Sequence, residues 1–440
     1  MRRTLPIFVV GVLALAGWGL KAWRSTLASS AVQAAAAPSV SRAPYNPALT
    51  HQTVEFWAAQ ARSDPQGSIA LANLSHWYLR SYRETGDMAD VTRAEKAARH
   101  AIAIRPLNYD AWADVARSLM TQHRFTEALV AAKWADAINP QDAPARPLRA
   151  ETYMELGDYR AAHHVLYDKP IKPTDTNAKA LRARLWEIEG NPAMALNLLQ
   201  QAQAEADRNL DMPPESVAWY HMRVGNILAA MGRATAAAQA YQAGLKLFPA
   251  DYRCMTALAK LMAGQGDWQG AIHWGQQAAA IVPTPEVLAL IGDAEAAEGH
   301  QQEASHQYQL VEAIGTLARS QGVIYDRQRA LFYADHNRHL DEALTLASHE
   351  LKARKDIYAY DTYAWACYKK GLIPQAQAAM QHALAHHTKD ASLYYHAGMI
   401  AYAHGDKITA KNYLTQALNT NPYFHPFEPR QARALLAKLG

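Results

Sequence analysis

The chain has 440 residues of globular composition, with 50% hydrophobic, 19% charged and 9% aromatic residues. That length exceeds one ordinary domain, so we expect several domains or one repetitive array. Four of the 44 basic residues, Arg2, Arg3, Lys21 and Arg24, lie in the first 24 residues, which contain no acidic residue, and the rest of the chain has 40 basic against 40 acidic residues. A neutral body excludes the sustained basic surface that sequence-independent nucleic-acid binding requires. Two cysteines exclude a disulfide scaffold and multi-cysteine metal motifs.

The first predicted element is an uncharged stretch over residues 5–20, LPIFVVGVLALAGWGL, which the four early basic residues flank. With the next few residues it approaches the length of about 20 that crosses a bilayer. A cleaved signal peptide would place small residues directly after this stretch, whereas the best triplet, Ala34–Ala36, lies further on. We therefore expect a retained single-pass anchor in the cytoplasmic membrane, with the body on the periplasmic side. The alternative is cleavage, which gives a soluble periplasmic or secreted protein.

Residues 25–50 are mostly Ala, Ser and Pro, and they predict a tether between this segment and the folded body. Beyond residue 68 the pattern is helical, without the sustained alternation that indicates strands. The chain also repeats itself. Prolines recur 34 residues apart, at Pro106 and Pro140 and again at Pro249 and Pro283, and an alanine precedes each by twelve positions, at Ala94, Ala128, Ala237 and Ala271. Such a period is typical of a stacked array.

The repeating residues resemble the tetratricopeptide repeat, a helix–turn–helix unit. Segments 109–142, 252–284 and 391–424 show the pattern most fully; the first carries Trp112, Ala116, Ala128, Ala135 and Pro140 at the signature positions. Weaker units start near 72, 143, 176, 218, 285, 324 and 357. The resemblance implies an all-α fold, an α-solenoid wound as a right-handed superhelix of about ten units after one hydrophobic N-terminal helix. The expected organisation is a signal segment over 1–24, a tether over 25–50, repeat arrays over 51–207 and 208–424, and a capping helix over 425–440.

No segment matches a phosphate-binding glycine loop, a nucleophile elbow or a common metal motif. His382 and His386 are spaced as a ligand pair on one helix, but no carboxylate or cysteine stands at a matching distance. We therefore expect no catalysis, no cofactor and no metal.

In this family the face of each first helix that points away from the second helix of its repeat lines a concave groove that binds ligands. The residues predicted for partner binding are Tyr325, Tyr358, Trp365, Tyr368, Tyr395 and Tyr402 towards the C-terminus, and Arg184, Asn226, Arg253 and Lys260 in the middle. The alternative for any one ring is packing between neighbouring first helices. Met222 stands where the two-carboxylate clamp of some family members has Lys, so that specificity is not expected.

The resemblance implies a scaffold that binds a protein or peptide partner in its groove and organises a complex at the cell envelope. The alternative is an accessory protein of polysaccharide assembly or export, because Tyr and Trp rings also stack on sugars. The partner's identity is open in either case.

Overall fold

The computed structural model describes residues 42–139, 145–168, 175–320 and 326–440, and these ranges contain only helices and their connections. The predicted anchor, most of the predicted tether and Tyr325 lie outside the described residues. Residues from Arg42 onward form one compact unit. Within the described ranges, no helix is both long enough and apolar enough to cross a membrane.

Ten helix pairs follow one another along the described part of the chain. The first helices of the pairs are α2 (Ser68–Thr85), α4 (Tyr109–Thr121), α6 (Ala145–Glu155), α8 (Thr176–Ile188), α10 (Pro214–Ala230), α12 (Tyr252–Gln265), α14 (Pro285–Glu298), α16 (Asp326–Asp335), α18 (Ile357–Lys369) and α20 (Ala391–His404). The second helices are α3 (Met88–Ile104), α5 (Phe125–Ile138), α7 (Tyr159–Tyr167), α9 (Pro192–Arg208), α11 (Ala234–Leu247), α13 (Trp268–Ile281), α15 (Gln301–Ser320), α17 (Leu340–Ala353), α19 (Ile373–Ala383) and α21 (Lys407–Thr420). A single helix, α1 (Pro47–Ser63), precedes the pairs, and another, α22 (Glu428–Leu439), follows them.

Local signals set the ends of these helices. Asp251 begins α12, where its side chain accepts hydrogen bonds from the backbone N–H groups of Arg253 and Cys254. Gly266 ends the same helix in the left-handed region, at φ 82°. The signature alanine of each second helix is at most 2% exposed: Ala94, Ala128, Ala162, Ala195, Ala237, Ala271, Ala304, Ala343, Ala376 and Ala410. This burial confirms the repeat register, because a small side chain there lets the two helices approach closely.

The sequence predicts a joint between two arrays at residue 208, where a short loop separates α9 from α10. Buried side chains on both sides of that loop, among them Leu199, Ala202, Val217 and Tyr220, belong to one core. The helices on the two sides of this loop therefore pack on each other without a break in the core.

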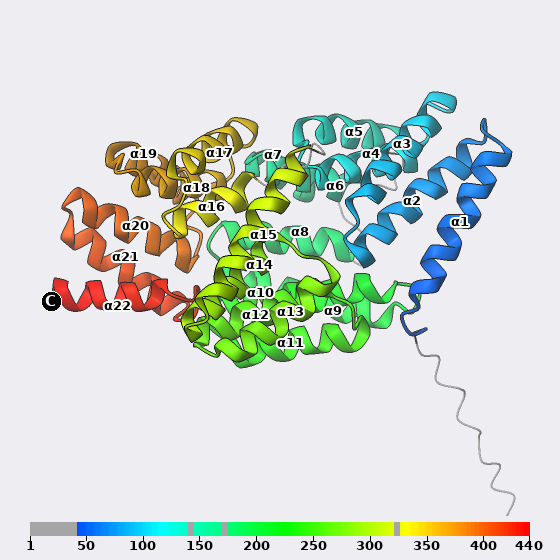
Figure 1. Cartoon of the computed structure of the whole chain (residues 1–440). Coiled ribbons are helices and arrows are strands. Elements are labelled where there is room, and N and C mark those ends of the chain that lie inside the picture. The colour runs from blue at the N-terminus through cyan, green and yellow to red at the C-terminus, as the bar shows by residue number, and fades with distance from the viewer. Residues whose placement is uncertain (1–41, 140–144, 169–174, 321–325) are drawn as a thin grey trace, which may run out of the picture. The chain divides into compact units, whose positions relative to one another are not determined.

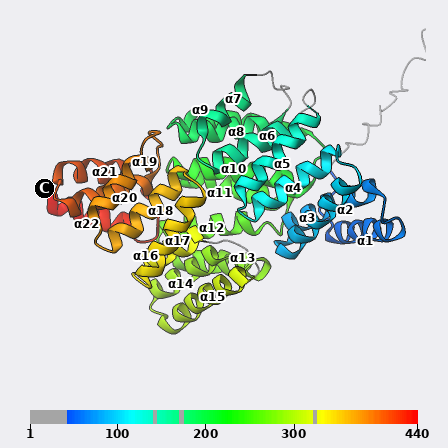
Figure 2. The ribbon, with the colours of Figure 1, turned by 90° about the horizontal axis from the view of Figure 1, so that it is seen from above.

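The solenoid also turns back on itself. Side chains from α6, α7 and α8 share one buried core with side chains from α18, α19 and α20 (Figures 1 and 2). Backbone contacts join the same two regions: the Lys355 amide donates to the Leu156 carbonyl at 3.2 Å, and the Thr388 hydroxyl donates to the Ile188 carbonyl. The third and fourth helix pairs thus lie against the ninth and tenth.

The last helix, α22, packs on this C-terminal region. Its Ala432 is fully buried in a cluster with Leu414 of α21 and Tyr395 of α20. Just before and within α22, Phe427 stacks on Trp268 at a centroid distance of 5.8 Å, and Arg430 lies 5.7 Å from the same ring. The predicted C-terminal capping helix is thus also held by the α13 region.

Candidate functional site

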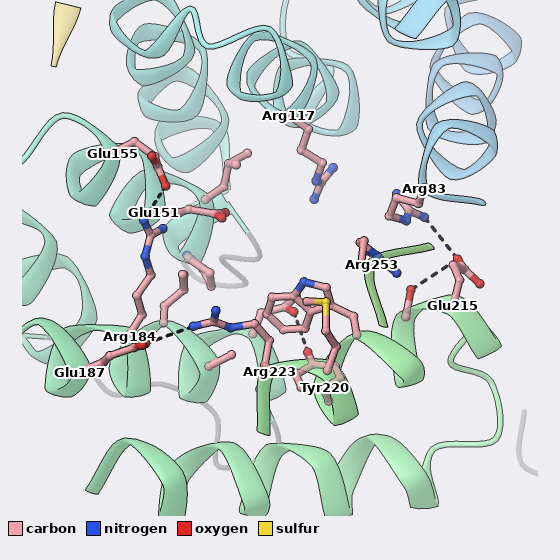
Figure 3. A pocket seen from close by; sticks show the side chains of 18 of the residues that line it. Arg83, Arg117, Glu151, Glu155, Arg184, Glu187, Glu215, Tyr220, Arg223 and Arg253 are labelled. Carbon is pink, nitrogen blue, oxygen red and sulfur yellow. Dashed lines mark hydrogen bonds and ion pairs between the residues drawn. The ribbon is translucent and has the colours of Figure 1, made fainter. Parts of the chain in front are cut away.

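Seven first helices, α2, α4, α6, α8, α10, α12 and α18, contribute side chains to one cavity of about 790 Å³ (Figure 3). The second helices contribute none of its lining residues. The cavity is therefore part of the inner face of the solenoid, and its size is in the range of about 300–1,000 Å³ that is common for ligand sites.

The wall of this inner cavity, as we call the space lined by these helices, carries many charged side chains beside apolar ones. Five arginines and four glutamates line it: Arg83, Arg117, Arg184, Arg223, Arg253, Glu151, Glu155, Glu187 and Glu215. The apolar part of the wall includes Leu148, Leu181, Ile188, Met222 and Trp219. The inner cavity thus offers both guanidinium groups and apolar surface to a ligand.

Most of these arginines form close ion pairs. Arg184 lies 2.6 Å from Glu155, and Arg223 lies 3.3 Å from Glu187. Arg253 makes two hydrogen bonds of 2.9 Å to the carboxylate of Asp251. Two parallel bonds of this kind fix the plane of a guanidinium group, so the Arg253 side chain is held in one orientation.

The structure brings together three of the residues that the sequence predicts for partner binding. Arg184 of α8, Arg253 of α12 and Tyr358 of α18 all line the inner cavity. Two other predicted residues are not among its lining residues. Asn226 accepts a hydrogen bond from the Tyr241 hydroxyl at 3.0 Å, and the exposed Lys260 pairs with Glu286 at 2.6 Å.

The C-terminal aromatic residues lie elsewhere and do not form an exposed row. Trp365 is 2% exposed and Tyr395 is fully buried. The Trp365 indole donates to Asp335 at 2.7 Å, and the Tyr395 hydroxyl donates to Gln431 at 2.6 Å. These two rings therefore pack inside the solenoid, which is the alternative that the sequence leaves open. Contact of either ring with a partner stays a prediction.

The remaining two aromatic residues of that set are accessible. Tyr368 is half-buried and stacks on Trp365 at a centroid distance of 4.9 Å, whereas Tyr402 is 40% exposed. Tyr368 and Tyr402 are 34 positions apart and share one repeat position, whereas Trp365 and Tyr395 stand at other positions of their repeats and are covered by neighbouring helices and α22.

Comparison with protein families identifies the repeat. Residues 224–284 and 391–424 match family models for the tetratricopeptide repeat. The chain contains tetratricopeptide repeats. Among solved structures, the human IFIT1 dimer with PPP-AAAA is 14% identical, with a TM-score of 0.48 and coverage of 72% of each chain. The APC/C hetero-tetramer Cut9–Hcn1 is 12% identical, with a TM-score of 0.34 and coverage of 89% of this chain and 94% of that chain. No curated protein sequence matches the chain.

The tetratricopeptide repeats place further arginines at the inner cavity that the sequence prediction did not select, among them Arg83, Arg117 and Arg223. Arg117 and Arg184 occupy the same position of their repeats, so the rule that selects Arg184 also selects Arg117. Arg83 lies 34 positions before Arg117, the same spacing that separates Ala94 from Ala128, so the register that is anchored on these alanines selects Arg83 as well.

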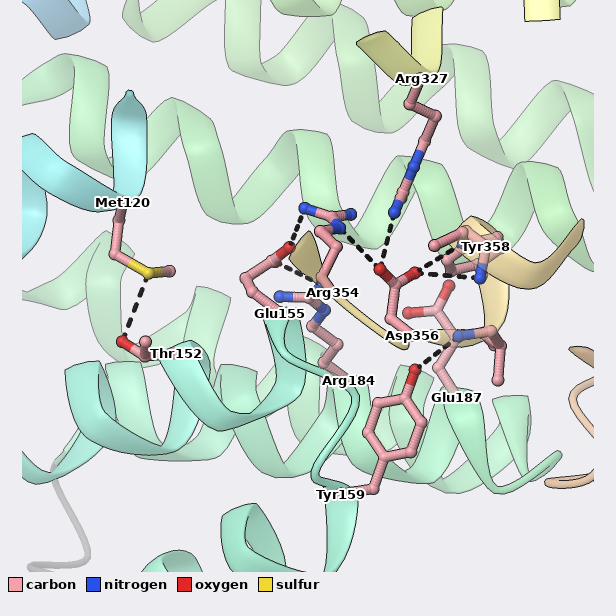
Figure 4. A network of polar contacts seen from close by, with 12 residues as sticks. Met120, Thr152, Glu155, Tyr159, Arg184, Glu187, Arg327, Arg354, Asp356 and Tyr358 are labelled. Atoms are coloured by element: carbon pink, nitrogen blue, oxygen red, sulfur yellow. Dashed lines mark hydrogen bonds and ion pairs between the residues drawn. The ribbon is translucent and has the colours of Figure 1, made fainter. Parts of the chain in front are cut away.

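A network of charged side chains next to the inner cavity links the tetratricopeptide repeats that meet where the solenoid turns back (Figure 4). Arg354 contacts Glu155 at 2.9 Å and Asp356 at 2.6 Å, and Arg327 contacts Asp356 at 2.7 Å. Burial by itself would raise the pKa of Glu155, but Arg184 and Arg354 lower it to about 2. The Glu155 carboxylate is therefore charged at any ordinary pH.

The described part of the chain holds neither a group of side chains that could bind a metal ion nor an accessible or disulfide-bonded cysteine. No group of three or more His, Cys, Asp or Glu side chains there could hold a metal ion. Cys254 and Cys367 are buried and not joined in a disulfide, and burial raises the pKa of both thiols. Both cysteines are thus packing residues of the repeats.

Proposed function

We propose that the protein is a non-catalytic scaffold that binds a protein or peptide partner on the inner face of its repeats and organises a complex at the cell envelope. The tetratricopeptide repeats support an interaction scaffold. One observation carries the choice of surface. Arg184, Arg253 and Tyr358, predicted as partner contacts from three separate repeats, all line one cavity.

A segment of the partner, rather than a folded domain, suits this surface. The inner cavity is surrounded by first helices of seven repeats, and its volume of about 790 Å³ is typical of a site that holds a drug-sized ligand. The half-buried side chains of Trp219, Met222 and Tyr358 offer apolar contacts beside the charged groups. Large side chains in such a site are typical anchors of a binding interface.

The test is a steric block of the inner cavity. Met222→Trp places a larger side chain at a half-buried position of the wall. Val130→Trp introduces the same residue on α5, where Val130 is 55% exposed and outside the cavity. Partners are captured by crosslinking in the native membrane and identified by mass spectrometry. We expect Met222→Trp to abolish capture of a specific partner and Val130→Trp to leave it intact. Equal capture by both variants would reject the inner cavity as the partner site.

A second surface, around the exposed Trp134 of α5, serves as the comparison surface for this test. Trp134 is 52% exposed and stacks on Trp112 at a centroid distance of 5.7 Å. If Met222→Trp retains capture, Trp134→Ala tests whether the partner contacts this surface instead.

The carbohydrate alternative has less support. It depends on a row of exposed rings, of which Tyr368 and Tyr402 are accessible while Trp365 and Tyr395 are buried. Retention of the protein on a polysaccharide column, lost in Tyr402→Ala, would favour this alternative over a protein partner.

The envelope location rests on the charge-flanked apolar stretch at residues 5–20. We expect the protein to stay in the membrane fraction after a carbonate wash, and protease to digest its body once the outer layer of the cell is permeabilised. Full release by the wash, with a mature N-terminus near Ala37, would show cleavage instead.

A further inference from the structure

Two arginines of the inner cavity, Arg117 and Arg253, are more accessible than the carboxylates that hold them. The side chain of Arg117 is 40% exposed and that of Asp114, its partner at 2.7 Å, is 2% exposed. The side chain of Arg253 is 23% exposed and that of Asp251 is fully buried. Asp114 and Asp251 are thus less accessible than the guanidinium groups that they hold, so a ligand in the inner cavity meets N–H donors first.

Arg83 is the least satisfied of these arginines. Its guanidinium lies 3.8 Å from the buried carboxylate of Glu215, which is too long for a hydrogen bond. The Arg83 Nε has no hydrogen-bond partner among the described residues. Burial lowers the pKa of the Arg83 guanidinium, and the nearby positive charges of Arg117 and Arg80 act in the same direction, against Glu215. An anionic group between Arg83 and Arg117 would supply the missing acceptor and offset this repulsion.

Three of the four glutamates in the wall do not offset this preference for an anionic ligand; the fourth, Glu215, lies 3.8 Å from both Arg80 and Arg83. Glu155 and Glu187 are held by Arg184 and Arg223. Glu151 carries no such close pair in the described structure, but burial raises the pKa of its carboxyl, against the opposing effect of Arg184. The burial of Glu151 thus disfavours the charged form of this carboxyl.

We propose that the inner cavity binds a peptide segment whose side chains carry oxyanion groups, with the anions at Arg83, Arg117 and Arg253 and apolar side chains against Leu181, Ile188 and Trp219. This inference rests on the proposed function and names the chemistry of the segment. The oxyanions are the carboxylates of Asp and Glu or the phosphates of a phosphorylated segment. A bare inorganic anion would leave the apolar part of the wall unfilled.

The test measures binding of synthetic peptides to the full chain by fluorescence anisotropy. Three labelled peptides alternate Leu with Glu, with phosphoserine or with Gln. We expect the Glu peptide, the phosphoserine peptide or both to bind at least about tenfold more tightly than the Gln peptide, and more weakly as salt increases. The tighter of the two anionic peptides identifies the source of the oxyanion.

Variants then locate the binding. In Arg253→Gln, Asp251 keeps its hydrogen bonds from the backbone of α12, so the fold should be retained. We expect this variant to lower the affinity for the anionic peptide at least about fivefold. Arg117→Lys keeps the positive charge but loses the paired N–H donors of the guanidinium group, and it should lower the affinity less. The control is Arg99→Gln on α3, where Arg99 is 49% exposed and pairs with Glu95 outside the inner cavity. It should not change the affinity.

Several outcomes would overturn the inference. They are failure of both anionic peptides to bind, equal affinity for the Gln peptide, and an Arg99→Gln effect as large as that of Arg253→Gln. The proposed function is judged separately, by partner capture. If Met222→Trp blocks capture and Arg253→Gln does not, the partner site stands and its anionic chemistry fails. If neither variant changes capture, both proposals fail.

Discussion

Arg354 donates a hydrogen bond to Glu155 at 2.9 Å, although 199 positions separate the two residues in the sequence. Glu155 is the last residue of α6, and Arg354 lies in the connection before α18. The other oxygen of Glu155 lies 2.6 Å from Arg184, a wall residue of the inner cavity. One carboxylate therefore joins the cavity wall to the contact at which the solenoid turns back on itself.

The first prediction concerns this return contact. Arg354 is 7% exposed, and Arg354→Gln should destabilise the protein by about 3 kcal/mol, because it leaves buried carboxylates with one cation fewer. Hydrogen exchange should speed up at the amide of Lys355, which donates to Leu156, before it does so in the N-terminal repeats. Arg99→Gln should change stability by less than about 1 kcal/mol, because Arg99 is 49% exposed and its partner Glu95 keeps Arg124 and Gln122. An equal increase in hydrogen exchange throughout the chain would contradict a contact that Arg354 stabilises locally.

The second prediction is a pH dependence. The pKa of Glu155 is lowered from 4.5 to about 2 in the folded protein, so the unfolded state binds the proton more tightly than the folded state does. The stability that Glu155 contributes is complete above about pH 4.5 and is lost as the pH falls towards 2. Urea unfolding midpoints measured through this range should fall more steeply for the wild type than for Glu155→Gln. Parallel curves would show that Glu155 is not the titrating group.

The third prediction uses two glycines with the same backbone conformation. Gly190 and Gly371 both have φ 75°. A Cβ at Gly190 would lie 2.2 Å from the carbonyl oxygen of His387, whereas a Cβ at Gly371 would have no atom within 4 Å. Gly371→Ala should therefore cost only the left-handed penalty of about 1–2 kcal/mol, and Gly190→Ala should cost clearly more. Thermal melts of both variants compare the costs, and equal losses would argue against the close approach of α8 and the connection before α20.

The fourth prediction separates packing from binding among the aromatic residues. Trp365→Ala removes a buried ring and its hydrogen bond to Asp335, so it should lower stability by about 3–5 kcal/mol. Tyr402→Ala, at a position that is 40% exposed, should stay within about 0.5 kcal/mol. Calorimetry measures both changes. A Trp365→Ala variant with unchanged melting would show that the ring is not a packing residue.

The repeat itself could be predicted from the sequence. The fixed spacing of small residues such as Ala128, Ala237 and Ala271 follows from the close crossing of two helices within one unit, and each is fully buried in the structure. This spacing depends on neighbouring residues alone, so a single sequence contains the information. Arg184 and Arg253 were placed on the inner face by the same register, and both line the inner cavity.

The contacts between distant repeats could not be predicted in this way. Gly190 has the signature of a helix end, which Gly371 shares, yet only Gly190 of the two lies against another turn of the solenoid. Trp365 and Tyr402 have similar sequence signals but very different exposure. Which repeats meet depends on small rotations that add up over many units, and no local pattern specifies their sum. The sequence by itself therefore determined the helix pairs and the direction of their inner faces, whereas only the tertiary structure decided which inner-face residues are buried, which are paired and which line the cavity.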